Sequence, residues 1–318
     1  MKRCFLYPLL ALLLCSLCSW GFFGHIRINR LAVFTLPPAI LPFYKSNISY
    51  ISLHAVDPDK RRYADTAEAA RHYLDVENYE AHIDSIPRKY EDALKKYGYK
   101  MLNENGVLPW HIQRSYLRLV NAFKQRDSIR ILTASTQLGH YIADAHVPLH
   151  TTRNHNGQLT NQHGIHAFWE SRLPELFATG YQVKPRRASY IEDPLKTAWQ
   201  MVSHSHALVD SVLHLEAALS RRYPRSQQQG FSRRSNSLVK QYAAGYAKAY
   251  HDAMNHMVER QMQQSILLIG SYWYSAWVDA GQPDLRQLKK QPASQDEVKI
   301  EQAKEQKFRQ GQIIGREI

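Results

Sequence analysis

Residues 127–150 read DSIRILTASTQLGHYIADAHVPLH and combine a clear helical pattern with many side chains that can bind metal. Asp127 is a good helix N-cap, because its carboxylate can accept hydrogen bonds from the free amides of the first turn. Pro148 stops the helix, since proline has no amide hydrogen to continue the ladder. Between them, apolar residues recur at helical spacing at Ile129, Leu132 and Leu138. The stretch therefore predicts a helix over 127–145.

Helical periodicity continues on both sides of this segment. The apolar spacing predicts further helices over 39–54, 76–98, 108–124, 165–178, 193–220 and 236–277. No alternating pattern typical of a strand appears, and the arginine-rich stretch 221–235 indicates a polar loop. We therefore expect an all-α fold, with a single multi-helix domain over residues 20–281.

The first 19 residues have the pattern of a secretory signal peptide. Lys2 and Arg3 precede an apolar run from Phe5 to Leu17, and Ser19 suits the position before a cut. The run is short for a membrane span. We therefore expect cleavage after Ser19 and export, to the periplasm of a bacterium or out of the cell.

The composition narrows the chemistry of the mature chain. All three cysteines lie within the predicted signal peptide, so any metal site must use His, Asp and Glu. The formal net charge is +13 for the full chain and +11 once Lys2 and Arg3 leave with the signal peptide, and such a charge would attract phosphates, nucleic acid and anionic lipid headgroups alike. From residue 282 the chain is charged, glutamine-rich and poor in aromatic residues, which predicts a disordered tail over 282–318.

The densest group of candidate ligands begins on the 127–145 helix. His140 and Asp144 are four residues apart, so both side chains project from one helix face and can reach one metal ion. His166 and Glu170 repeat this spacing on the next helix, and His150 lies between the two pairs. One such pair alone would indicate a surface ion pair. Two pairs and a further histidine favour a catalytic zinc site, which uses imidazole and carboxylate ligands.

Two earlier stretches add ligands of the same kinds. Asp57 lies fifteen residues before His72, and Asp59, thirteen residues before it, is the alternative. Signal-peptide cleavage would free the amine of Trp20, five residues before His25. A free amine can chelate a metal together with its own carbonyl oxygen.

The order of these residues resembles the zinc-dependent phospholipase C and single-strand nuclease superfamily, and is closer to its bacterial phospholipase C branch. The resemblance rests on the N-terminal Trp with a His five residues later, the Asp-to-His gap of fifteen, the His-x3-Asp-x5-His run and the later His-x3-Glu. It covers roughly residues 20–170 and implies an all-helical fold with three zinc ions.

The resemblance also implies how the ions are held. One ion would bind Asp57, His72, His140 and Asp144. A second ion would bind His150, His166 and Glu170. A third would bind the amine and carbonyl of Trp20, with His25 and Asp144. Asp144 would bridge two ions, and Asp57 would orient the attacking water, so these two carboxylates are the expected catalytic residues.

The implied activity is hydrolysis of phosphodiester bonds, and the resemblance favours a zinc-dependent phospholipase C acting on phospholipid. Glu170 stands where the nucleases usually carry Asp, and the mature chain lacks the cysteines that nucleases commonly have. The positive charge and many tyrosines would also suit single-stranded nucleic acid, so a single-strand-specific zinc nuclease or 3′-nucleotidase stays open. A non-catalytic zinc or lipid-surface binding protein is the third reading. We expect peripheral contact with anionic membrane and no obligate protein partner.

Overall fold

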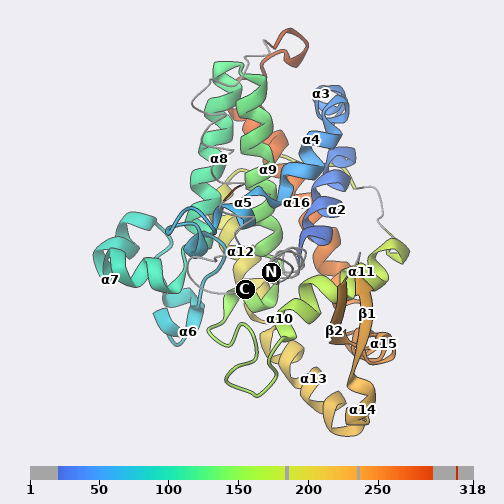
Figure 1. The fold of residues 1–318 in the computed structure, drawn as a ribbon. Coiled ribbons are helices and arrows are strands. Elements are labelled where there is room, and N and C mark those ends of the chain that lie inside the picture. Colours follow the sequence, from blue (N-terminus) through green and yellow to red (C-terminus); the bar gives the residue numbers. More distant parts are fainter. Residues whose placement is uncertain (1–20, 183–185, 235–236, 289–305, 307–318) are drawn as a thin grey trace, which may run out of the picture.

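A computed structural model describes residues 21–182, 186–234, 237–288 and residue 306. Four long helices form the centre of the molecule: α2 (Phe22–Ala32), α8 (Leu108–Gln125), α9 (Ser128–Asp144) and α16 (Met257–Asp279). The helices α8 and α9 run side by side, and α16 contacts α2, α8 and α9 (Figure 1). The described chain is mostly helical, which confirms the predicted fold class.

The other helices and turns surround the central helices. The remaining helices are α3 (Leu41–Ser46), α4 (Ile48–Leu53), α5 (Asp57–Arg61), α6 (Val76–Tyr79), α7 (Tyr90–Asn105), α10 (Ile165–Ala167), α11 (Leu173–Phe177), α12 (Pro194–His206), α13 (Val209–Arg222), α14 (Arg225–Gln228) and α15 (Ala244–Ala253). Short 3-10 turns are η2 (Val33–Thr35), η3 (His54–Val56), η4 (Ala69–Arg71), η5 (Ile83–Ser85), η6 (Pro148–Thr151), η8 (Ala178–Gly180) and η9 (Leu285–Gln287), and η7 (Phe168–Arg172) is a π-helical turn.

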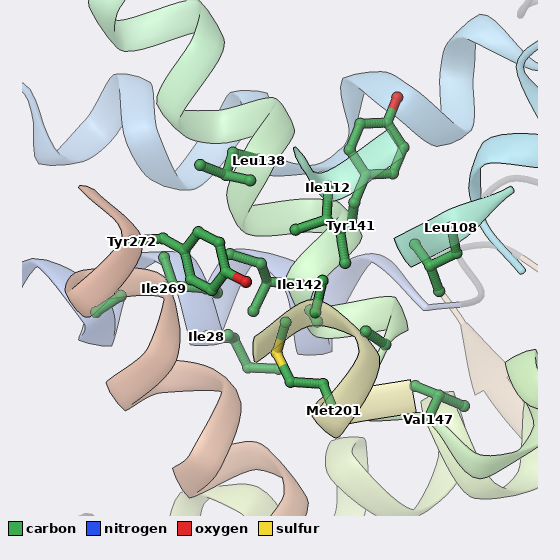
Figure 2. Close-up of a cluster of buried hydrophobic side chains, with 14 of the residues drawn as sticks. Ile28, Leu108, Ile112, Leu138, Tyr141, Ile142, Val147, Met201, Ile269 and Tyr272 are labelled. Atoms are coloured by element: carbon green, nitrogen blue, oxygen red, sulfur yellow. The ribbon is translucent and has the colours of Figure 1, made fainter. Parts of the chain in front are cut away.

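The hydrophobic core lies where the central helices meet α12. Figure 2 shows Ile28 of α2, Ile112 of α8, Ile142 of α9, Met201 of α12 and Ile269 of α16 gathered in one cluster. Burial of such side chains stabilises the fold by about 1.5–3 kcal/mol each. The core therefore holds α2 and α9, which carry candidate ligands, in a fixed relation.

The helices predicted over 108–124, 127–145 and 165–178 are all present. Asp127 caps α9 as expected, accepting from the amides of Ile129 at 3.0 Å and Arg130 at 3.1 Å. The 165–178 segment is helical over 165–177 but changes winding, because α10 and α11 are joined by the π turn η7. Such turns re-aim side chains and are frequent at functional sites.

Three predicted helices are divided in the structure. The 39–54 segment breaks at Asn47 into α3 and α4. The 76–98 prediction is wrong in its middle, where Ile86 is extended because a proline follows it, and α7 begins only at Tyr90. The 193–220 segment divides at residues 207–208 into α12 and α13. The helix α2 was not predicted at all.

The prediction of a helix starting at 236 and of no strands is wrong. Strands β1 (Gln229–Arg234) and β2 (Ser237–Tyr242) form an antiparallel hairpin in which Phe231 pairs with Lys240. Phe231 and Leu238 are exposed, so the hairpin has no buried apolar face that would show as an alternating pattern. The remainder of the predicted helix is divided at Asn255 and His256, whose φ angles are positive.

The two predicted terminal segments lie largely outside the described residues, including the whole signal peptide. Residues 282–288 are described, and here Leu285 is buried and Trp277 Nε1 donates to the carbonyl of Pro283 at 2.9 Å. The first residues of the predicted tail are thus packed on α16. Within the described chain, no helix combines the length and apolar character needed to cross a membrane.

Candidate metal centre

Side chains from six separate elements converge near the C-terminal end of α9. They form three groups in which the ligand atoms lie within 4.8 Å of one another: His25, His140 and Asp144; Asp59, His72 and His140; and His150, His166 and Glu170. The first and second groups share His140. All these residues are buried except Asp59 and Glu170, which are partly exposed.

Asp144 lies at the centre of the cluster. Its Oδ2 atom is 2.9 Å from His72 Nδ1 and 3.3 Å from His140 Nε2. Its Oδ1 atom is 3.3 Å from His25 Nε2. The two oxygens of one carboxylate thus face different histidines, and the sequence spacing of His140 and Asp144 on α9 gives the expected common face.

His25 is contributed by α2, the helix that the sequence pattern did not reveal. Its ring stacks on that of His140 with centroids 4.0 Å apart. Its Nε2 atom also lies 3.3 Å from Glu170 Oε1. His25 therefore stands between the Asp144 carboxylate and the Glu170 carboxylate.

The structure favours Asp59 over Asp57 as a candidate ligand. The Asp57 carboxylate pairs with His54 Nδ1 at 2.6 Å and Lys60 Nζ at 3.5 Å, and it belongs to none of the three groups. Asp59 Oδ1 lies 3.7 Å from His72 Nδ1 and 3.6 Å from His140 Nε2. The two aspartates are two residues apart on α5, about 200° around the helix, so they face different ways. Asp59 is therefore the better candidate ligand of the two.

The third group follows from the turn after α9 and from the π turn. Glu170 Oε2 lies 2.8 Å from His166 Nε2 and 3.3 Å from His150 Nε2. Glu170 is in η7, and its carboxylate also reaches the first group through His25. The three groups are therefore one connected centre.

Backbone carbonyls determine which nitrogen of several histidines carries the proton. His140 Nδ1 lies 2.8 Å from the Ala55 carbonyl, and His150 Nδ1 lies 2.7 Å from the His72 carbonyl. His166 Nδ1 lies 3.2 Å from the His155 carbonyl. Each Nδ1 must donate to its carbonyl oxygen, so each neutral ring presents a lone pair at Nε2.

Those lone pairs point at carboxylate oxygens, which also carry no proton when ionised. Lone pairs of nitrogen and oxygen that face one another repel unless a cation lies between them. Burial alone would raise the pKa of Glu170, but the neighbouring His150 and His166 hold it well below its usual range. Burial opposes protonation of His25, yet Glu170 and Asp144 raise its pKa to about 9. Both effects mark a site that attracts positive charge, and imidazole with carboxylate suits zinc.

A buried carboxylate, Glu68, supports His72 from the side away from the candidate metal site. Glu68 was not identified from the sequence. His72 Nε2 lies 3.5 Å from Oε1 of Glu68, a fully buried carboxylate, while Nδ1 faces the metal-binding groups. Glu68 is in turn held by Arg61, by Arg71 and by the hydroxyl of Tyr141. The Glu68-x3-His72 spacing was the available signal, since it matches that of His140 and Asp144. Carboxylates placed in this way orient metal-binding histidines.

The first described residue lies beside the same centre. A β-carbon added to Gly21 would be 3.8 Å from Glu170 Oε1, and Gly21 lines a pocket of about 360 Å³ together with His25 and Glu170. Trp20, the predicted N-terminal ligand, lies outside the described residues.

Other histidines from the same region do not join the three groups. His146 is buried with its Nδ1 atom 2.7 Å from the Ile142 carbonyl, which is a structural contact within α9 and the turn after it. His155 contributes its backbone carbonyl to His166, and the side chain of His163 is exposed.

Comparison with known families agrees with this centre. The profile of the family described as zinc dependent phospholipase C matches residues 24–233, which include every described candidate ligand. A comparison with curated proteins finds no significant match. The matched region covers well over half of the chain, and the site within it has the donor set that zinc requires. The chain therefore belongs to the zinc dependent phospholipase C family.

Proposed function

We propose that this protein is an exported phospholipase C that hydrolyses the glycerol–phosphate bond of phospholipids at a centre of three zinc ions. The observation that carries the proposal is the set of three connected His/Asp/Glu groups inside the matched family region. The family supplies the phospholipid as the substrate class. Export rests on the signal-peptide pattern of residues 1–19.

The proposed ligand sets are supported by the contacts described above, except for Trp20, which is proposed from the family resemblance and lies outside the described residues. One zinc ion would bind Asp59, His72, His140 and Asp144. A second would bind His150, His166 and Glu170. A third would bind His25, Asp144 and the amine and carbonyl of Trp20. Bound zinc supplies Lewis acidity and lowers the pKa of a water ligand toward 7.

Asp144 and Asp59 would have different roles in the proposed reaction. Asp144 holds two ligand groups at a fixed separation, because its two oxygens contact different histidines. Asp59 is 21% exposed while its histidine neighbours are buried, so its carboxylate lies on the open side of the centre. In this position Asp59, and not Asp57, would orient the attacking water and accept its proton.

The proposal is tested by hydrolysis of phosphatidylcholine and of single-stranded DNA, side by side, with zinc and with chelator. The protein should begin at Trp20. Zinc-dependent release of a phosphorylated headgroup is the expected result. Zinc-dependent DNA breakdown instead would keep the metal centre and overturn the substrate, and full zinc binding without turnover of either would make the protein a binding protein.

Two matched pairs of proteins sharpen this test. Asp59→Asn should lose zinc and activity, whereas Asp57→Asn should keep both, because only Asp59 faces His72 and His140. Equal loss in the two variants would contradict the ligand assignment.

A protein with a peptide extension before Trp20 lacks the free amine and should bind one zinc ion fewer than the cleaved form. Equal zinc content would exclude Trp20 as a ligand.

A further inference from the structure

A second concave site lies apart from the metal centre. It has a volume of about 550 Å³ and is formed by the η4 turn, α7 and the start of α8. None of the candidate metal ligands lines it.

Two positively charged side chains contribute to this pocket. Arg71 and Arg114 both line it. Arg71 is shared with Asp65 and Glu68, but Arg114 has no carboxylate at ion-pair distance in the described part of the chain. Its guanidinium carbon instead lies 5.4 Å from the ring centroid of Tyr90. An exposed arginine held at a pocket wall without an acidic partner is available to an anion.

His111 adds a polar ring to the wall of this pocket. It lines the pocket and is only 4% exposed, yet neither of its ring nitrogens has a hydrogen-bond partner among the described residues. Its only described ring contact is with Tyr141, centroid to centroid at 4.4 Å. Burial and the nearby Arg71 lower its pKa well below the usual range, so the ring is neutral and one nitrogen carries a proton. The ring nitrogens of His111 are not among the fully enclosed polar atoms that lack a partner, so water or a ligand in the pocket can form hydrogen bonds with them.

The remaining walls are polar and aromatic. The helix α7 is interrupted at Gly98, where φ is 77° and ψ is 159°, and Asn103 in its second half adds an amide to the pocket. Tyr90, Tyr99 and Trp110 present flat surfaces. Hydrogen-bond donors thus come from η4, α7 and α8, and the aromatic side chains beside them can pack against an organic group.

We propose that this pocket binds a small phosphate monoester, with its phosphate between Arg71, Arg114 and His111 and its organic part against the aromatic walls. Three terminal oxygens can accept from donors on several sides at once, which a planar carboxylate does less well. Arginine is well suited to such recognition. The ligand could be a free monoester from the surroundings or a phosphorylated headgroup released at the metal centre.

The test is calorimetric titration of the zinc-loaded protein with phosphocholine and with glycerol 3-phosphate. Zinc also binds phosphates, so the readout is the difference between proteins of equal zinc content. Arg114→Gln should remove one binding component or weaken it about tenfold or more, the size of a lost charged hydrogen bond. His111→Phe, which keeps a ring but loses the donor, should weaken the same component.

Arg118→Gln is the matched control, because Arg118 is one turn along α8, exposed, and outside the pocket lining. It should change binding less than about twofold. Binding of both monoesters would indicate a general site, and binding of phosphocholine alone would indicate the headgroup. The proposal is overturned if wild type and Arg114→Gln bind both compounds equally, or if Arg118→Gln loses as much as Arg114→Gln. Since turnover is not measured, the result is independent of the proposed activity.

Discussion

Glu68 offers the sharpest test of how the protein supports its metal centre. Glu68→Gln keeps the shape of the side chain and removes its charge. Two guanidinium groups would lose their shared partner: Arg61, whose Nε lies 3.2 Å from Glu68 Oε2, and Arg71. The same change also removes the carboxylate that lies 3.5 Å from His72 Nε2. One substitution should therefore affect stability and zinc affinity separately.

The two magnitudes follow from burial. Removing one partner of a buried ion pair costs about 3–5 kcal/mol. Glu68 is fully buried, whereas Arg61 is 15% and Arg71 25% exposed, and Arg71 keeps Asp65. We therefore expect a loss near the lower end, about 3 kcal/mol of unfolding free energy. Loss of the group that orients a metal-binding histidine weakens metal binding about 10–100-fold.

Each effect has its own assay. Denaturant unfolding in the presence of chelator measures the ion network without zinc, and zinc titration against a competing chelator measures the affinity. Glu216→Gln is the control, since Glu216 is buried but bonded to neutral groups, Tyr246 and Gln162. It should leave zinc affinity unchanged. Wild-type zinc affinity in Glu68→Gln would refute the positioning role, and wild-type stability in chelator would refute the buried ion network.

Three further predictions concern the groups around this network. Asp144→Asn should bind markedly less zinc than any other single ligand variant, because both Asp144 oxygens contact ligand histidines, and full zinc content by elemental analysis would contradict this. Gly139→Ala should lower the unfolding free energy by about 1–3 kcal/mol, because an added β-carbon would lie 2.0 Å from Asn29 Oδ1 and disturb the contact of α2 with α9. A wild-type melting temperature would show that Asn29 moves freely. His111 has a folded-state pKa below its unfolded value of 6.5, so its contribution to stability is present above pH 6.5 and is lost as the pH falls below it. The stability of His111→Phe should therefore decline less steeply than that of wild type from pH 6.5 downward, and parallel profiles would contradict the neutral assignment.

The candidate site was predictable to the extent that its geometry is local. The pairs His140 with Asp144 and His166 with Glu170 are four residues apart, and helix geometry alone places such pairs on one face. In the structure both pairs meet, at 3.3 Å and 2.8 Å. The helical class of the fold was predictable for the same reason, because apolar residues at helical spacing indicate helices whatever their packing.

Choices that depend on residues far apart in the chain needed the tertiary structure. Asp57 and Asp59 are chemically equal in the sequence, and only the orientation of α5 against α9 brings Asp59 to His72 and His140. The hairpin of β1 and β2 forms through cross-strand pairing, and its Phe231 and Leu238 side chains are exposed. The sequence therefore shows no alternation of apolar and polar residues that would predict these strands.

The same distinction explains the two features that the sequence pattern did not reveal. Glu68 supports His72 only because Arg61, Arg71 and Tyr141 surround it, and Tyr141 comes from another helix. The basic pocket exists because η4, α7 and α8 meet there. The sequence by itself determined the helical class of the fold and the pairs His140 with Asp144 and His166 with Glu170, because helical periodicity and four-residue spacing are local properties of the chain. Packing decided which carboxylates face the histidines, because burial and long-range contact are properties of the assembled chain.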